Sequence, residues 1–249
     1  MSKRERAVSR AAPGSDSLNS PQGASVSPWR NRLRSLRAYL RTWTMTSSER
    51  RYQQRVLKRL DSGQRLGTLG NQIEDEVNAR ERADQWLANM VALGLRPEHT
   101  CIEYGCGSLW CAEPIIRYLG RGRFVGLDMT DRFYELGRER LQQLVAEKDA
   151  RFAVISRRSL GDIAKLKPNF VYSHRVIHHV SRSGLQRYVQ NLLSLLNEQS
   201  TLVIENIRPL KPNGSRKGRK HSMADIQRHV PPQWECRQES FGVVITHRA

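Results

Sequence analysis

The sequence predicts an α/β fold: a doubly wound, mostly parallel sheet of seven strands with an antiparallel C-terminal hairpin strand. Three observations predict it. From residue 100 onward, short apolar runs alternate with amphipathic helical segments, as in parallel strands joined by helical crossovers. A tight glycine turn, Gly105-Cys106-Gly107, follows the first of these runs. The last two runs are separated by little more than Phe241, which predicts a hairpin.

The expected elements follow in chain order. Each helical segment repeats its apolar residues every three or four positions, and each strand is a short run rich in aromatic and β-branched residues. Helices are expected over residues 73–93, 112–119, 131–147 and 184–196, with a short one in "MADIQRHV". Strands are expected over residues 101–104, 123–128, 151–156, 169–174, 201–207, 234–240 and 242–248.

The N-terminal part of the chain is predicted to lie outside this folded domain. The net charge is +18, and residues 1–60 hold 14 Lys or Arg against three acids. Residues 1–28 predict a disordered basic leader, residues 29–70 a basic amphipathic helical extension, and residues 71–249 the domain itself. The arginine-rich helix "WRNRLRSLRAYLRTW" suits an anionic membrane surface, nucleic acid or the protein's own body, so residues 29–60 are the candidate contact with such partners.

Several classes of protein are disfavoured by composition. No apolar run approaches the roughly 20 residues that span a bilayer, so no transmembrane segment is expected, and "MSKRER" does not open a secretory signal. The cysteines, at 101, 106, 111 and 236, match no zinc spacing, so we expect reduced thiols and no metal site. Reduced thiols favour a cytoplasmic location, with organelle targeting as the alternative because the N-terminus is rich in Arg and Ser.

The glycine turn predicts a nucleoside-binding site. Gly105 and Gly107 lack a Cβ, so the backbone can approach a ligand closely, and the helix that follows offers free N–H groups. Asp128 ends the second strand, where its carboxylate can accept hydrogen bonds from both hydroxyls of a ribose. Dinucleotides and S-adenosylmethionine both fit. Trp110 at the third glycine position and Glu103 before the turn argue against a nicotinamide dehydrogenase.

Three stretches together resemble the class I S-adenosylmethionine-dependent methyltransferases: "IEYGCGS", "VGLDMT" and "NFVYSHRVIHHV". The resemblance covers about residues 70–249 and implies a methyltransferase domain with S-adenosylmethionine as its cofactor. By position, it implies that Glu103, Gly105, Cys106 and Gly107 line the methionine and ribose of the cofactor. It further implies that Asp128 binds the ribose diol, that Met129 packs on the adenine, and that Ser173 and His174 lie beneath the cofactor.

The sequence departs from the family pattern at three places. Leu109 stands where the family often has a third glycine, Arg157 follows the third strand in place of an acidic residue, and Asn169 opens the fourth strand in place of Asp. These departures keep open the alternative of a non-catalytic cofactor-binding module of the same fold.

The acceptor is not identified by the sequence. A general base is needed if the nucleophile carries a proton, and His178, just past the fourth strand, is the candidate, with His174 and Tyr172 behind it. A structural role for the His-His pair is the alternative. A small molecule or sugar-containing metabolite is the expected acceptor, by analogy with the family. An RNA or other polyanion is the alternative, favoured by the basic N-terminus and the basic loop 210–220, and that acceptor could itself be anionic.

Overall fold

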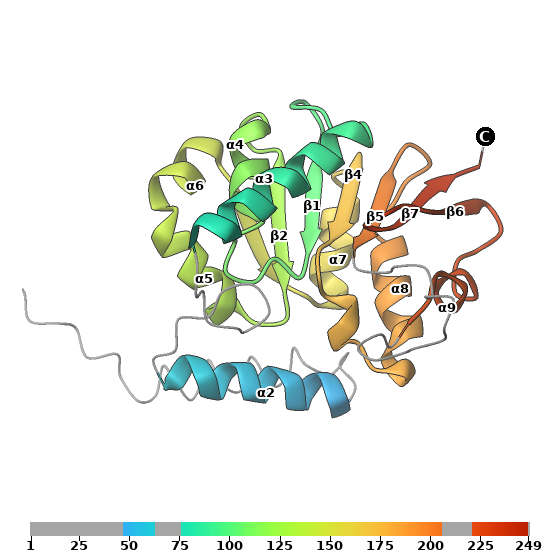
Figure 1. The fold of residues 1–249 in the computed structure, drawn as a ribbon, viewed down its shortest axis with the longest axis horizontal. Coiled ribbons are helices and arrows are strands. Elements are labelled where there is room, and N and C mark those ends of the chain that lie inside the picture. The colour runs from blue at the N-terminus through green and yellow to red at the C-terminus, as the bar shows by residue number, and fades with distance from the viewer. Residues whose placement is uncertain (1–46, 63–75, 206–220, 249) are drawn as a thin grey trace, which may run out of the picture. The chain divides into compact units, whose positions relative to one another are not determined.

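A computed structural model describes residues 47–62, 76–205 and 221–248 (Figure 1). The chain divides into two units, Met1–Leu36 and Arg37–Ala249, and every described residue belongs to the second. The predicted leader, the arginine-rich helix of residues 29–43 and the basic loop 210–220 lie outside the described residues.

The core of the domain is a seven-stranded sheet with the order β3-β2-β1-β4-β5-β7-β6. All neighbouring strands are parallel except β7, which runs antiparallel to both β5 and β6. The strands are β1 Cys101–Tyr104, β2 Phe124–Asp128, β3 Arg151–Val154, β4 Phe170–Ser173, β5 Thr201–Glu205, β6 Trp234–Gln238 and β7 Gly242–His247. The predicted doubly wound sheet with its antiparallel C-terminal strand is confirmed. The strand order reverses between β1 and β4, the point where such sheets bind ligands.

Helices cover both faces of the sheet (Figure 1). They are α2 Ser47–Asp61, α3 Glu76–Ala92, α4 Ala112–Tyr118, α5 Asp131–Arg140, α6 Gln142–Lys148, α7 Arg157–Ala164, α8 Leu185–Leu193 and α9 Met223–Gln227, with two short 3₁₀ turns, η3 Ile177–His179 and η4 Arg182–Gly184. Helices α3, α4, α5 and α6 share one buried cluster with the sheet, and α7, α8 and α9 share the other. Alternate residues of β1 to β5 and of β7 face opposite sides of the sheet, as the pleat requires, whereas the edge strand β6 contributes Trp234 and Cys236 to one cluster alone.

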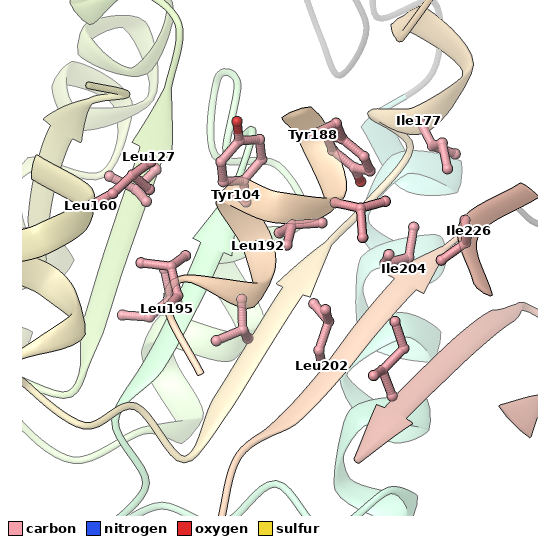
Figure 2. Packing of buried hydrophobic residues seen from close by; sticks show 14 of the residues in the cluster. Tyr104, Leu127, Leu160, Ile177, Tyr188, Leu192, Leu195, Leu202, Ile204 and Ile226 are labelled. Carbon is pink, nitrogen blue, oxygen red and sulfur yellow. The ribbon is translucent and has the colours of Figure 1, made fainter. Parts of the chain in front are cut away.

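The cluster beneath α8 positions the site. Figure 2 shows Tyr188, Leu192 and Leu195 of this region packed over the sheet residues Leu202 and Ile204. Burial of such side chains contributes roughly 1.5–3 kcal/mol each, which fixes α8 against the ends of β4 and β5. One edge of α8 is thereby held beside the carboxyl end of the parallel strands.

Two local predictions were wrong. Strand β3 ends at Val154 rather than residue 156, because Ser156 caps a helix, α7, that the sequence did not predict. The Ser156 side chain accepts a hydrogen bond from the Ser159 backbone N–H at 3.1 Å, and Ser159 Oγ accepts one from the Ser156 N–H at 2.9 Å. The helix expected over 131–147 is divided into α5 and α6 at Leu141, whose φ of −108° and ψ of 25° leave the helical region.

Within the described ranges, none of the helices is both long enough and apolar enough to span a membrane.

Candidate functional site

A pocket opens at the carboxyl ends of the parallel strands, on the side where the strand order reverses. The residues that follow the first four strands supply much of its wall: Gly105, Gly107, Asp128, Met129, Ile155, His174, Arg175 and Val176. Helix α8 and the segment before it supply Val180, Arg187, Tyr188 and Asn191, and α2 supplies Tyr52 and Val56. The predicted glycine turn and ribose carboxylate are therefore brought together in one cavity.

The glycine turn has the backbone conformation that only glycine adopts readily. Gly105 has a φ of +87° and Gly107 a φ of +52°. The backbone N–H groups of Gly105 and Cys106 both donate to the Leu127 carbonyl, at 2.7 and 2.9 Å, which ties the turn to β2. A Cβ on Gly105 would lie 2.3 Å from Val176 Cγ2. A side chain is therefore excluded there by both conformation and space.

Asp128 is held by that same turn. Its Oδ2 accepts the Gly107 N–H at 2.8 Å and its Oδ1 accepts the Met129 N–H at 2.7 Å. Burial raises the pKa of the carboxyl to about 6, against the opposing effect of these backbone hydrogen bonds. A carboxylate has about four acceptor sites, so the backbone N–H groups of Gly107, Met129 and Thr130 leave it with acceptor capacity to spare. Asp128 is thus an oriented acceptor at the edge of the pocket.

Glu103, by contrast, lies in the core below the turn. It is 2% exposed, and Tyr172 donates its hydroxyl to Glu103 Oε2 at 2.9 Å. Burial raises the pKa of Glu103 to about 8, so the group is protonated at neutral pH. Neither Glu103 nor Cys106 is among the pocket-lining residues, and Cys106 is also buried. The structure therefore places both beneath the surface that a ligand would touch.

Ser173 and His174, the two residues predicted at the end of β4, differ in their access to the pocket. Ser173 is fully buried; its hydroxyl donates to the Tyr104 carbonyl at 2.9 Å and accepts from the Tyr188 hydroxyl at 2.7 Å. His174 lines the pocket, with its Nε2 at 4.0 Å from Glu205 Oε2. Burial lowers the pKa of His174 to about 3, and the nearby Arg175 charge adds to the effect. His174 is therefore a neutral imidazole, and in the described part of the chain its Nδ1 has no hydrogen-bond partner.

The paired histidines lie on the short turn η3. His179 lines the pocket and His178 does not, although their rings are in contact with centroids 4.3 Å apart. The His179 ring also stacks on Tyr52, at 4.4 Å and an interplanar angle of 27°. Tyr172 is committed to Glu103 in the core. Of the three residues named as candidate base and support, only His174 reaches the cavity itself.

Helix α2 forms one wall of the pocket, a role that was not predicted from the sequence. Gln53 Nε2 donates to the Met129 carbonyl at 2.9 Å, next to Asp128. Val56 packs on Phe133, and Asp61 pairs with Arg132 at 2.7 Å. The signal was present in the sequence, because Tyr52, Val56 and Leu60 recur every four residues and form a helical apolar stripe.

The four cysteines are free thiols, and burial raises the pKa of Cys106 and of Cys111. Within the described ranges, no three His, Cys, Asp or Glu side chains are grouped as a metal site requires.

Comparison with known proteins identifies the fold. A scan against protein-family models finds no match, and a search of curated proteins finds no significant one. Among solved structures, the chain is similar to magnesium protoporphyrin IX methyltransferase from Synechocystis with bound S-adenosylmethionine. The TM-score is 0.51 at 16% identity, over 90% of this chain and 98% of that one. It is also similar to an S-adenosylmethionine-dependent methyltransferase from Anabaena variabilis, with a TM-score of 0.54 at 17% identity over 68% and 85% of the two chains. The chain therefore has the Rossmann-like fold of the class I S-adenosylmethionine-dependent methyltransferases.

Proposed function

We propose that the protein is an S-adenosylmethionine-dependent methyltransferase that acts on a small-molecule acceptor. The observation that carries this proposal is the position of Asp128. Its carboxylate ends β2, faces the pocket, and is oriented by the N–H groups of Gly107 and Met129. A buried carboxylate with open acceptor sites beside a glycine turn suits the two hydroxyls of a ribose.

The other side chains around Asp128 suit an adenosine moiety. Met129, just past β2, and Ile155, just past β3, line the pocket and would give an adenine apolar surface to pack on. Gly105 and Gly107 line the pocket, and the methionine part of the cofactor would lie above their turn. Glu103 and Ser173 would support the site from below, by holding Tyr172 and Tyr188 in place. Cys106 would contribute its backbone to the turn.

The cofactor supplies an electrophilic methyl group. The protein has to hold the acceptor in line with this methyl group and to exclude water. Helices α2 and α8, which form two walls of the pocket, are placed to do both. A protonated nucleophile also has to lose its proton. His174, with a pKa of about 3, is a weak proton acceptor at neutral pH. We therefore propose that the two histidines of η3 accept this proton. His179 would contact the acceptor, and His178, the residue predicted from sequence, would lie behind it.

A small acceptor is favoured by the character of the pocket wall. Tyr52, Tyr104, Phe133 and Tyr188 give it an aromatic lining, and α2 covers one side. The alternative of an RNA or other polyanion is favoured by the exposed basic residues of α2, including Arg50, Arg51 and Arg55. The third possibility, a non-catalytic cofactor-binding module, predicts cofactor binding without transfer to any acceptor.

Calorimetric titration of the full chain with S-adenosylmethionine, S-adenosylhomocysteine and NAD tests the proposal. We expect the first two to bind and NAD not to bind. Asp128→Asn keeps the shape of the side chain but removes an acceptor and the charge, and should weaken binding by about tenfold or more. Asp162→Asn, at an exposed position of α7, is the matched control and should change nothing. Binding of NAD alone would overturn the proposal.

A further inference from the structure

Two arginines line the pocket but have no role in the cofactor contacts proposed above. Arg175 lies two residues past the end of β4, and Arg187 lies in the first turn of α8. Both line the cavity, and both are half-buried. Across the residues that the structure describes, neither guanidinium makes an ion pair or a hydrogen bond. A guanidinium that loses part of its hydration in a cavity gains from an anionic partner there.

Arg175 is held in a strained conformation. Its φ is +53°, in the left-handed region, which disfavours residues other than glycine by about 1–2 kcal/mol. The Glu205 carboxylate fixes this conformation by accepting the Arg175 N–H at 2.9 Å. The Arg175 charge lowers the pKa of both His174 and Cys111, which places it beside the β4 end of the pocket. Local strain of this kind persists where a side chain has to be aimed.

Arg187 is also unfavourably placed for the stability of its own helix. The N-terminal turn of a helix carries partial positive charge and favours anions, yet α8 has an arginine and no acid there. Asn191, one turn later on the same face, lines the pocket as well, and its Nδ2 donates to the Tyr104 hydroxyl at 3.0 Å. The edge of α8 that faces the cavity therefore presents donors to whatever lies in it.

We propose that Arg175 and Arg187 together bind an oxyanion, a carboxylate or phosphate ester, on the acceptor, whose apolar or aromatic body packs on Tyr104 and Tyr188. This inference rests on the proposed methyltransferase function and names the class of its substrate. The strand-end contacts proposed for the cofactor come from β1, β2 and β3, whereas the two arginines come from the segment after β4 and from α8. Guanidinium groups recognise both kinds of oxyanion through paired hydrogen bonds.

The test is binding of three matched probes to the full chain, with and without saturating S-adenosylhomocysteine. The probes are 2-naphthoate, 2-naphthyl phosphate and the neutral 2-naphthamide. We expect at least one anion to bind about tenfold or more tightly than the amide. Arg187→Gln and Arg175→Gly should each reduce that preference to about threefold or less, whereas Arg182→Gln, an exposed arginine on the adjacent η4 turn, should retain it. The better-bound anion identifies the oxyanion.

Stability separates a binding role for Arg175 from a structural one. Glycine adopts a positive φ without strain, so Arg175→Gly should melt at the same or a higher temperature while it loses the anion preference. A lower melting temperature would contradict the argument from strain.

Other outcomes would overturn the proposal. Equal affinity of all three probes in the unsubstituted chain would do so, as would retention of the preference in both variants. Weaker binding of S-adenosylhomocysteine in the variants would assign the arginines to the cofactor's own carboxylate. Binding of oligouridylate that is lost in both variants and falls steeply with salt would point to nucleic acid instead. Failure of the proposed function is distinguishable, because it appears in the unsubstituted chain as no binding of S-adenosylhomocysteine, or as cofactor binding without methyl transfer to any acceptor, whatever the probes do.

Discussion

The side chain of Leu109 fills the space that a side chain at Gly137 would need. A Cβ built on Gly137, in α5, would lie 2.5 Å from Leu109 Cγ and 2.6 Å from the Ser108 carbonyl oxygen. Leu109 itself is fully buried and has a φ of +64°. Leu109 therefore has a left-handed backbone conformation, which glycine adopts most readily, and its side chain fits because α5 has no side chain at Gly137.

Replacement of Gly137 by alanine tests this relationship. In an exposed helix, Gly→Ala stabilises by about 1 kcal/mol. Here we expect Gly137→Ala to destabilise the protein by about 1–3 kcal/mol, because the new methyl overlaps Leu109 and the backbone of Ser108. Urea denaturation measures the change. Part of the loss should return in a Leu109→Gly background, and strictly additive effects of the two substitutions would contradict the packing argument.

The buried Glu103 predicts that the protein loses stability as the pH rises towards 8. Its pKa is about 8 in the folded protein against an ordinary 4.5, so the folded state holds a proton that the unfolded chain releases. Stability is therefore lost as pH rises from 4.5 to 8. His174 has the opposite effect, because its pKa is lowered from 6.5 to about 3. It makes stability rise as the pH increases from 3 to 6.5 and adds no further change above pH 6.5. The loss between pH 6.5 and 8 should be roughly 2 kcal/mol.

The control for this loss is Glu103→Gln, whose amide oxygen can still accept from Tyr172. Urea midpoints measured between pH 6.5 and 8 should fall in the unsubstituted protein and stay level in the variant. Parallel slopes in the two proteins would assign the pH dependence to another group.

Asp128 predicts a pH dependence of cofactor binding. In the proposed site the ribose hydroxyls donate to the ionised carboxylate, and burial raises the pKa of Asp128 to about 6. Affinity for S-adenosylhomocysteine should therefore rise roughly tenfold between pH 5 and 7 and then level off. Calorimetry across this range gives the profile. Asp128→Asn should bind more weakly at pH 7, with a flat profile; a flat profile in the unsubstituted protein would remove the carboxylate from the ribose site.

Tyr52 predicts that α2 contributes to cofactor binding. Its ring stacks on His179 and lines the pocket near Asp128. Tyr52→Ala should weaken the affinity for S-adenosylhomocysteine by about threefold to tenfold, since an aromatic wall is lost. Gln54→Ala, an exposed neighbour on α2, should leave it unchanged. Tighter binding in Tyr52→Ala would instead mean that α2 has to leave for the cofactor to enter.

The central part of the fold could be predicted from the sequence because it depends on local patterns. Strand β1 is found where it was expected, at Cys101–Tyr104. The turn that follows needs Gly105 and Gly107 for conformational reasons that a sequence shows directly. Asp128 is placed by the same logic, at the end of the next strand.

The rest depends on contacts that no local pattern encodes. Helix α7 begins at a cap made of Ser156 and Ser159, a short polar pair that is equally typical of a loop. The depth of Glu103 follows from its hydrogen bond to Tyr172 on another strand. The choice between His178 and His179 follows from the turn η3, which presents one ring to the pocket and leaves the other beside it.

The most direct test of the account is a crystal structure of the full chain with S-adenosylhomocysteine. We expect both ribose hydroxyls to lie within hydrogen-bonding distance of Asp128, the adenine beside Met129, and the homocysteine part above the turn from Gly105 to Gly107. Nucleoside density elsewhere, or a ribose that contacts no carboxylate, would contradict it.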